Sequence, residues 1–421
     1  MKVLWIVNVE LAALRRELGL RSVSSGGWMD GAVAGLKNAS DDLQLGVASM
    51  FSGKKLEHHI IDGIDFYRVP YRFRTRRDCR GDRFFQELYA SFQPDLVHVH
   101  GTEYPHAFSA VSNLGNIPSV VSLQGIISAI NPFCLGGISP WTLLRHTSLR
   151  DVVKCDLPTA VCGSMKKRSQ IERALLSRVR NVIGRTDWDH AHALHINPSL
   201  RYFHNDESLR EEFYGGTLWA QEKCEKHTIF ASNSSIPLKG MHRLIEALAL
   251  VKRKYPDVHL YIAGADIIHN VDWKTRLKLT GYQCYLRRLI VDLGVKDQIS
   301  FTGSLSAEKM RERFLRSNVY VLPSAIENSP NTLGEAQILG APVIASDVGG
   351  VLSMVKHLEN GVICRYDEPV QFAYWIDRIF SEPQLAARIG RNAAAEAARR
   401  HDRRVNAETL SQIYKTIIDE K

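Results

Sequence analysis

The chain has 421 residues, of which 45% are hydrophobic and 24% charged, and its formal net charge is +9. This length exceeds one typical core, so we expect two domains of roughly 200 residues in an ordinary globular protein, which excludes a disordered or fibrous chain. The positive charge favours anionic partners such as nucleotide phosphates, nucleic acid or an acidic membrane face.

The distribution of residues disfavours a membrane-spanning protein and a disulfide-rich protein. No run of 18 or more apolar residues occurs, and the apolar stretch before Glu10 is too short for a signal peptide. The cysteines are scattered, odd in number and form no C-x-x-C pair: Cys79, Cys134, Cys155, Cys162, Cys224, Cys284 and Cys364. This pattern argues against a disulfide framework and a zinc site, and it predicts a reducing cytoplasm.

In the first half of the chain, short apolar runs alternate with helical patterns. Strands are predicted at residues 3–9, 43–50, 64–69, 95–100, 119–124 and 179–184. Strands spaced by helices in this way form βαβ units, so we expect a parallel, doubly wound sheet. The turn after the first strand contains Gly26 and Gly27, which either cradle a phosphate or only let the chain turn. It is not the G-x-G-x-x-G of dinucleotide sites.

A basic run follows the third predicted strand. Residues 68–84 contain only Asp78 and Asp82 as acids, against Arg68, Arg72, Arg74, Arg76, Arg77, Arg80 and Arg83. A solvated loop explains such a run as well as a binding surface does. The alternative is that Arg68 to Arg83 dock the chain on an anionic membrane, where each cation contributes on the order of 1 kcal/mol.

Two further strand ends in the first half carry polar side chains that suit a site. The segments "PDLVHVHG" and "SLQG" place His98, His100 and Gln124 there. Strand alternation points His98 and His100 to the same face, and without a third ligand we expect no metal. We expect His98 to be packed or hydrogen-bonded. His100 lies at the strand tip, where a catalytic role and a packed, structural role are equally compatible with the sequence.

The alternation breaks at residues 204–227, which are charged, contain glycine and hold no strand pattern. We therefore predict the domain junction there. A second alternating set has strands at residues 228–232, 258–264, 299–303, 319–324 and 341–346, and one or two helices are predicted over 392–420. The predicted fold class is α/β with two doubly wound domains. Ligands in such folds bind at the carboxyl ends of the strands, here in the cleft between the domains.

The stretch "AIENSPNTLGEA", residues 325–336, directly follows a predicted strand and holds Glu327 and Glu335. Ser329 as N-cap and Pro330 as first helical residue predict a helix start, with Glu335 in the second turn. The helix terminus suits a phosphate, while each carboxylate suits hydroxyl groups, at roughly 1.5–3 kcal/mol per charge-assisted bond. Hydroxyls on both sides of a diphosphate describe a nucleotide sugar. The alternative is a solvated Glu327 and a Glu335 that only interacts with the helix dipole.

Lys239 precedes Gly240 at the start of a helical pattern, after the first strand of the second half. A lysine there either reaches an anion in the cleft as a point charge or remains exposed in a loop.

Taken together, these residues resemble the retaining glycosyltransferases of family 4, which have the GT-B fold, over nearly the whole chain. The specific part is the E-x7-E signature from Glu327 to Glu335; Lys239-Gly240, "ISFTGSLSAEKM", "PDLVHVHG" and "GGW" stand in family-like order. The resemblance implies two Rossmann-like domains facing a central cleft. Residues 1–205 would hold the acceptor, 206–227 the linker and 228–402 the donor, with helix 403–421 packed back on the first domain.

The resemblance also assigns roles to individual residues. Glu327 and Lys239 would be catalytic, contacting the transferred sugar and the diphosphate, and Glu335 would bind the ribose. The remaining donor-binding positions would be Asn328, Ser329, Asn331, Thr332, Leu333, Gly26 and Gly27. His100 and Gln124 would lie on the acceptor or sugar side. The family needs no divalent metal, so we expect neither a metal nor a cofactor besides the donor substrate.

Two positions depart from the family pattern. The arginine that often precedes the Lys-Gly pair is replaced by Ser232-Asn233, so Asn233 takes its place, and Arg185 is our candidate for the missing cation. The family's frequent histidine is Gln124 here, which puts a catalytic side chain at that position in doubt. Retaining transfer in this family is thought to use the leaving phosphate as the base.

The predicted function is transfer of a hexose, with retention, from a nucleotide-diphosphate sugar to a glycan or lipid-linked saccharide in bacterial surface polysaccharide synthesis. We expect a cytoplasmic enzyme, peripheral on the inner face of the membrane. The alternatives are an epimerase or hydrolase of the same fold and a non-catalytic nucleotide-sugar binding protein. A nicotinamide dehydrogenase is excluded because G-x-G-x-x-G is missing, and nucleic acid is not an expected partner.

Overall fold

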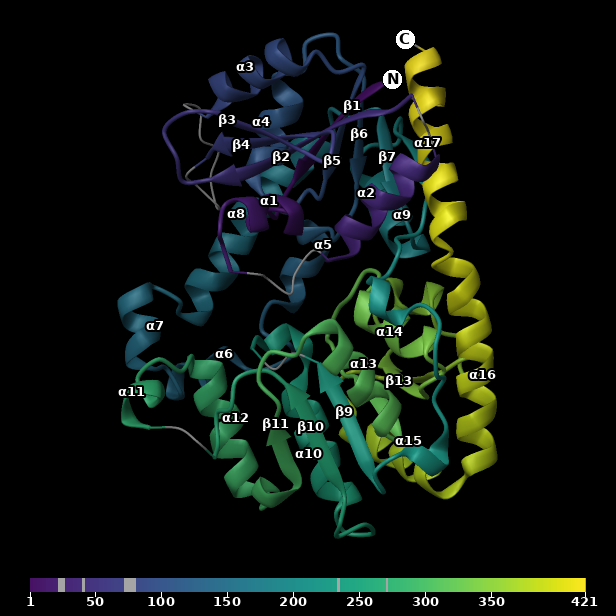
Figure 1. Ribbon diagram of the computed structural model, residues 1–421. Coiled ribbons are helices and arrows are strands. Elements are labelled where there is room, and N and C mark those ends of the chain that lie inside the picture. The colour runs from purple at the N-terminus through teal and green to yellow at the C-terminus, as the bar shows by residue number, and fades with distance from the viewer. Residues whose placement is uncertain (22–26, 40–41, 72–80, 233–234, 270–271, 421) are drawn as a thin grey trace. The chain divides into compact units, whose positions relative to one another are not determined.

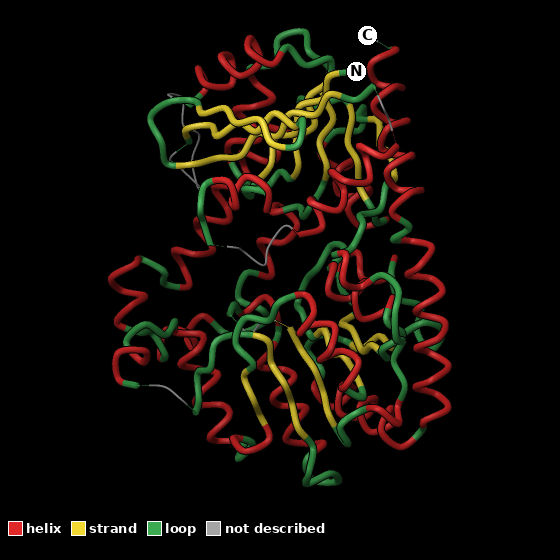
Figure 2. The backbone as a smooth tube through the Cα atoms, viewed as in Figure 1, coloured by secondary structure: helices red, strands yellow, loops and turns green. Residues whose placement is uncertain are grey.

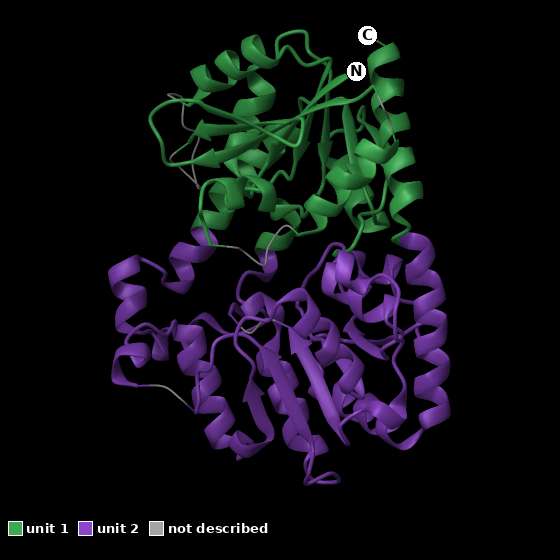
Figure 3. Cartoon of the chain, in the orientation of Figure 1, with its two compact units in different colours: residues 1–131, 164–210, 401–421 green, residues 132–163, 211–400 purple. Residues whose placement is uncertain are grey.

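The computed structural model describes the whole chain except residues 22–26, 40–41, 72–80, 233–234, 270–271 and 421 (Figure 1). The chain forms two compact units (Figure 3). Unit 1 comprises residues 1–131, 164–210 and 401–421, and unit 2 comprises 132–163 and 211–400. Each unit contains a sheet with helices packed around it (Figure 2). Among the described residues, no helix is long and apolar enough to cross a bilayer.

The sheet of unit 1 has the strand order β3-β4-β2-β1-β5-β6-β7-β8. Its described strands pair in parallel, except that the edge strand β3 runs antiparallel to β4. The strands are β1 (Lys2–Val7), β2 (Gln44–Phe51), β3 (Glu57–Ile61), β4 (Ile64–Pro70), β5 (Leu96–His100), β6 (Ser119–Ser122), β7 (Asn181–Gly184) and β8 (Arg201–His204). The central strand β1 is buried from Val3 to Val7 because helices cover both faces, which explains its continuous apolar sequence.

Unit 1 has one hydrophobic cluster on each face of its sheet. Leu4, Ile6 and Phe85 belong to one cluster, and Trp5 and Tyr414 belong to the other, in which Trp5 Nε1 donates a 2.9 Å hydrogen bond to Tyr414 Oη. The helices are α1 (Ala12–Glu17), α2 (Gly27–Ala39), α3 (Asp82–Phe92), α4 (Pro105–Ser112), α5 (Ile127–Ile130), α9 (Asp187–Ile196) and α17 (Arg403–Asp419). The C-terminal helix α17 packs against α2, and so belongs to the first unit.

The sheet of unit 2 is entirely parallel over its described strands, in the order β11-β10-β9-β12-β13-β14. The strands are β9 (Thr228–Ser232), β10 (His259–Ala263), β11 (Ile299–Phe301), β12 (Val319–Leu322), β13 (Val343–Ser346) and β14 (Val362–Cys364). The helices are α6 (Pro140–Arg145), α7 (Leu149–Lys154), α10 (Met241–Val251), α11 (Trp273–Arg276), α12 (Gly281–Asp292), α13 (Ala307–Arg316), α14 (Asn331–Ile338), α15 (Pro369–Ser381) and α16 (Pro383–Arg400). Helix α8 (Pro158–Leu176) contains the boundary between the two units. The α/β fold class with two doubly wound sheets is confirmed.

The segment 132–163 belongs to unit 2, whereas the predicted first domain ran without interruption from residue 1 to 205. Its tertiary contacts explain the difference. Asp151 accepts a 2.6 Å hydrogen bond from the backbone N–H of Gly281, and Leu143 and Ile138 lie in the core of unit 2. Contacts between segments so distant in sequence leave no local pattern from which they could be predicted.

The cysteine spacing argues against a disulfide framework, yet Cys134 is bonded to Cys162, a pair that the sequence did not predict. These residues lie 28 positions apart, near the two ends of the same segment. The spacing of the cysteines in the sequence therefore does not indicate this pair, which only the fold brings together. Cys155, Cys224, Cys284 and Cys364 carry free thiols.

Replacing Cys134 and Cys162 with serine is expected to lower the free energy of unfolding by about 2–4 kcal/mol, because the unfolded chain regains the freedom of a long loop. Urea unfolding of both forms, with and without reductant, measures the difference. The matched control is Cys155→Ser, which removes an exposed free thiol and should leave the midpoint unchanged. Equal midpoints for the native chain and the Cys134/Cys162 variant would show that the bond adds no stability.

Candidate functional site

Lys239 and Glu327 form an ion pair in unit 2, beyond the carboxyl ends of the neighbouring parallel strands β9 and β12. Lys239 Nζ lies 2.6 Å from Glu327 Oε1, and the hydroxyl of Ser324 donates a 2.7 Å hydrogen bond to the same oxygen. The side chains are 26% and 11% exposed, so the pair is shielded yet open to a ligand. An ammonium and a carboxylate are thus held side by side, one suited to an anion and the other to hydroxyl groups.

Two loops hold this pair in place through close backbone contacts. The N–H of Ala325 donates a 2.9 Å hydrogen bond to the carbonyl oxygen of Leu238. Gly240 has φ +66°, and a Cβ at this position would lie 1.8 Å from the carbonyl oxygen of Pro323. Gly349 makes a similar approach, since its Cβ would lie 2.0 Å from the carbonyl oxygen of Glu327. Only glycine fits at these two positions.

Gly240→Ala is expected to destabilise unit 2 by about 1–3 kcal/mol, because a backbone carbonyl cannot yield to the added methyl group as a flexible side chain can. Thermal unfolding checks the effect. Gly294→Ala is the matched control: Gly294 also has a positive φ, of +65°, but its Cβ would meet nothing within 4 Å. If both variants lose the same stability, the backbone conformation and not the close approach sets the requirement for glycine.

Helix α14 carries Glu335 in its second turn, but the helix begins one residue later than predicted. It starts at Asn331, with Pro330 in the N-cap position at an extended ψ of 116°. The prediction of Ser329 as the N-cap is therefore wrong: its hydroxyl donates to Met354 Sδ at 3.6 Å instead of capping the helix. Glu335 is buried, with 2% of its surface exposed.

Tyr320 on β12 joins the pieces of this site, although it was not predicted as a site residue. Its hydroxyl donates a 2.9 Å hydrogen bond to Thr332 Oγ1 and lies 2.8 Å from Ser232 Oγ. Burial raises the pKa of Tyr320 well above its usual range, so the phenol stays protonated and able to donate. A tyrosine in an otherwise aliphatic strand was the available signal. Tyr320 thereby connects the end of β9 with the first turn of α14.

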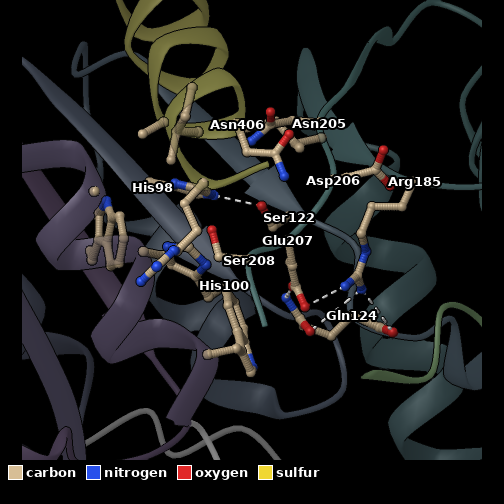
Figure 4. Close-up of a pocket in the computed structure, with 18 of the residues that line it drawn as sticks. His98, His100, Ser122, Gln124, Arg185, Asn205, Asp206, Glu207, Ser208 and Asn406 are labelled. Atoms are coloured by element: carbon tan, nitrogen blue, oxygen red, sulfur yellow. Dashed lines mark hydrogen bonds and ion pairs between the residues drawn. The ribbon is translucent and has the colours of Figure 1, made fainter. Parts of the chain in front are cut away.

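In unit 1, His98 and His100 lie on the same face of β5, as alternation predicts, with ring centroids 3.8 Å apart. His98 is hydrogen-bonded to Tyr414 Oη and Ser122 Oγ, each at 2.6 Å, which makes it a structural residue. His100 lines a cavity of about 40 Å³ (Figure 4). Among the described residues, neither ring nitrogen of His100 has a hydrogen-bond partner. Burial, with Arg185 nearby, lowers the pKa of His100 to about 3, so its imidazole is neutral.

Gln124 and Arg185 lie at the same cavity and are held by Glu207 (Figure 4). Gln124 Nε2 donates a 2.7 Å hydrogen bond to Glu207 Oε1, and Arg185 Nη1 lies 2.5 Å from Glu207 Oε2. Arg185 is also buried and donates to the carbonyl oxygen of Leu123. Arg185 is therefore buried and paired with Glu207 inside unit 1, and its role as a cation for the diphosphate stays a prediction.

Several predicted positions give little or no information here. Gly26 and Asn233 lie outside the described residues, as does most of the arginine run. Gly27 begins α2, where a Cβ would lie 3.3 Å from the side chain of Arg210. Asn328 and Leu333 are buried. Among the described residues, no group of three His, Cys, Asp or Glu side chains is placed to hold a metal ion.

Residues 220–396 match the family model of the glycosyl transferases group 1. The match lies within unit 2 and covers less than half of the chain. The matched glycosyl transferase segment contains Lys239, Glu327 and Glu335, so the family recognised from the sequence is confirmed.

Curated relatives are similar in sequence to only part of this chain. The putative glycosyltransferase YtcC of Bacillus subtilis is 31% identical over 199 residues, which are 47% of each chain. The D-inositol 3-phosphate glycosyltransferase of Acidothermus cellulolyticus is 34% identical over 116 residues, 28% of this chain and 26% of its own. The chain thus matches less than half the length of these relatives.

Solved structures of glycosyltransferases match the whole chain in fold. Sucrose-phosphate synthase from Thermosynechococcus elongatus has a TM-score of 0.72 at 15% identity and covers 100% of both chains. Anabaena Alr3699/HepE in complex with UDP-glucose has a TM-score of 0.66 at 16% identity, covering 99% of this chain and 100% of its own. The predicted GT-B fold is confirmed.

Proposed function

We propose that the chain is a glycosyltransferase that moves a sugar from a nucleotide-diphosphate sugar to an acceptor hydroxyl, with retention at the anomeric carbon. The observation that carries this proposal is the Lys239–Glu327 pair, held by glycine-dependent loops at the carboxyl ends of β9 and β12. It lies within the family-matched segment, at the edge of the sheet where ligands bind in doubly wound folds.

The donor is the substrate whose chemistry this site fits. Lys239 supplies a positive charge for a diphosphate, while Glu327 accepts hydrogen bonds from sugar hydroxyls and Glu335 from the ribose. Backbone N–H groups at the start of α14, together with Asn328, Ser329, Asn331, Thr332 and Leu333, complete the contacts with the donor. The relative Alr3699/HepE has been crystallised with UDP and with UDP-glucose, which supports a nucleotide sugar.

The reaction needs charge stabilisation more than a side-chain base. As the bond from the anomeric carbon to the diphosphate breaks, Lys239 and the α14 terminus stabilise the departing anion. An oxygen of that diphosphate takes the proton of the acceptor hydroxyl, which attacks from the same face and so retains the configuration. Neither a metal nor a cofactor has a part in this scheme.

On the acceptor side, we propose His100 and Gln124 as contacts, because they line one cavity of unit 1 and the ring nitrogens of His100 have no hydrogen-bond partner in the described part of the chain. A glycan or lipid-linked saccharide as acceptor, in bacterial surface polysaccharide synthesis at the cytoplasmic face of a membrane, is supported by the sequence resemblance alone.

A thermal-shift screen against a panel of nucleotide-diphosphate sugars tests the proposal. A donor at a hundredfold its dissociation constant should stabilise the chain by about 2.7 kcal/mol. Glu335→Ala should weaken the response to that donor, because a buried carboxylate that accepts from the ribose is lost. A flat response across the panel, from a folded chain, would contradict the proposed donor class.

A further inference from the structure

Two short pieces of unit 2 expose many large apolar side chains. On α6, α7 and the first turns of α8 these are Trp141, Leu144, Leu149, Val152, Val153 and Val161, and on α11 and directly after it they are Trp273 and Leu277. We call this set the Trp141–Trp273 face. Trp141 is 74% exposed and Trp273 is 67% exposed, although a tryptophan usually buries most of its surface. Clustered apolar exposure of this kind marks an interaction surface.

Both pieces are attached near the start of α12. Asp151 of α7 accepts the hydrogen bond from the N–H of Gly281, and α11 directly precedes α12 in the chain. Figure 1 shows α7 and α11 on the same side of unit 2. The Cys134–Cys162 bond closes the ends of the segment that carries Trp141. The apolar side chains are therefore presented by an anchored structure.

Cations are interleaved with the apolar side chains. Arg145, Lys154, Lys274, Arg276 and Lys278 are exposed on the same elements or next to them. The acids nearby already have local partners: Asp151 and Asp272 accept backbone hydrogen bonds at the starts of helices, and Asp156 pairs with Arg150 at 2.9 Å. Lys274 Nζ also lies 5.6 Å from the centre of the Trp273 ring. The face therefore combines exposed tryptophan with an excess of positive charge.

We propose that the Trp141–Trp273 face docks the chain on a bilayer containing anionic phospholipid. Tryptophan inserts at the level of lipid headgroups, while neighbouring lysine and arginine side chains attract anionic lipid. A protein partner would favour a contact centre depleted of charge, whereas here the cations stand among the apolar groups. The inference does not depend on the glycosyl transfer reaction, and nothing in the Lys239–Glu327 site takes part in it.

This face differs from the arginine run that the sequence suggested as a membrane contact. Arg68, at the start of that run, is held in unit 1 by ion pairs of 2.9 Å to Glu10 and 2.6 Å to Glu57. Residues 72–80 lie outside the described part of the chain. The two surfaces belong to different units, so separate substitutions distinguish them.

Co-sedimentation with vesicles of equal parts phosphatidylcholine and phosphatidylglycerol tests the proposal. The native chain should bind these vesicles, bind pure phosphatidylcholine much more weakly, and release in high salt. Trp141→Ala with Trp273→Ala should lower the partition coefficient at least about tenfold. Lys274→Glu with Lys278→Glu should lower it comparably and remove most of the salt dependence. Each variant should keep the native unfolding midpoint, because only exposed side chains change.

The matched control is Val370→Ala with Tyr374→Ala on α15, where the side chains are 68% and 52% exposed, and it should bind as the native chain does. Three results would overturn the proposal. The first is that the native chain fails to bind the vesicles. The second is that both face variants bind normally while Arg76→Glu with Arg77→Glu abolishes binding. The third is that sedimentation velocity shows the native chain as a dimer and the tryptophan variant as a monomer, with no change in vesicle binding.

Discussion

Glu327→Ala should lower turnover at saturating donor by roughly one to three decades, from about 1.4–4 kcal/mol of lost transition-state stabilisation. The carboxylate lies 2.6 Å from Lys239 and accepts from Ser324, so it is held in a fixed position before any substrate arrives. A prepositioned hydrogen-bond acceptor costs little reorganisation during the reaction. Steady-state kinetics of nucleoside diphosphate release measure the effect.

Glu327→Gln separates the charge of this side chain from its shape. The amide can still accept a hydrogen bond from Ser324 but cannot pair with Lys239 as an anion. We therefore expect a turnover lower than that of the native chain and higher than that of the alanine variant. Glu246→Ala is the control, because Glu246 also pairs with a cation, Arg243 at 3.0 Å, but on the surface of α10. Near-native turnover of Glu327→Ala would contradict the catalytic role assigned to Glu327.

Lys239→Ala should also lower turnover by about one to three decades, since it removes the cation that we propose stabilises the departing diphosphate. Lys239→Arg keeps the charge but changes its shape and reach, so it should recover part of the lost rate. If the lysine acted only by holding Glu327, the loss would appear in the apparent affinity for donor as much as in turnover. A loss confined to the Michaelis constant would contradict the role in stabilising the leaving group.

The double substitution of Lys239 and Glu327 should cost less than the sum of the two single effects. Each single change leaves a charged partner without its counter-ion, and this penalty disappears when both are removed. Additive losses in the double variant would show that the two residues act independently, which the 2.6 Å contact argues against.

The sequence predicted the main strands of both sheets because they are buried on both faces and therefore strongly apolar. The predicted strand at 319–324 corresponds to β12, and that at 95–100 to β5. The strands β3, β8 and β14 were not predicted. Strand β3 is an antiparallel edge that alternates with exposed side chains, and the apolar run of β14 is only three residues long, too short to indicate a strand.

The site was predictable to the extent that its chemistry is local in the sequence. Glu327 and Glu335 belong to one strand–loop–helix, so their spacing carried the signal. The role of Tyr320 as a connector and the pairing of Arg185 with Glu207 depend on contacts between distant segments. The insertion of residues 132–163 into unit 2, with its disulfide, was hidden for the same reason.

The anomeric configuration of the released sugar tests the central claim most directly. The chain is incubated with the nucleotide sugar that stabilises it, with water as a slow acceptor, and the first product is followed by proton NMR before mutarotation. We predict nucleoside diphosphate and a sugar with the donor's own anomeric configuration, both strongly reduced in Glu327→Ala and Lys239→Ala. An inverted anomer, an epimerised sugar, or binding of the donor without any turnover would contradict the proposed retaining transfer.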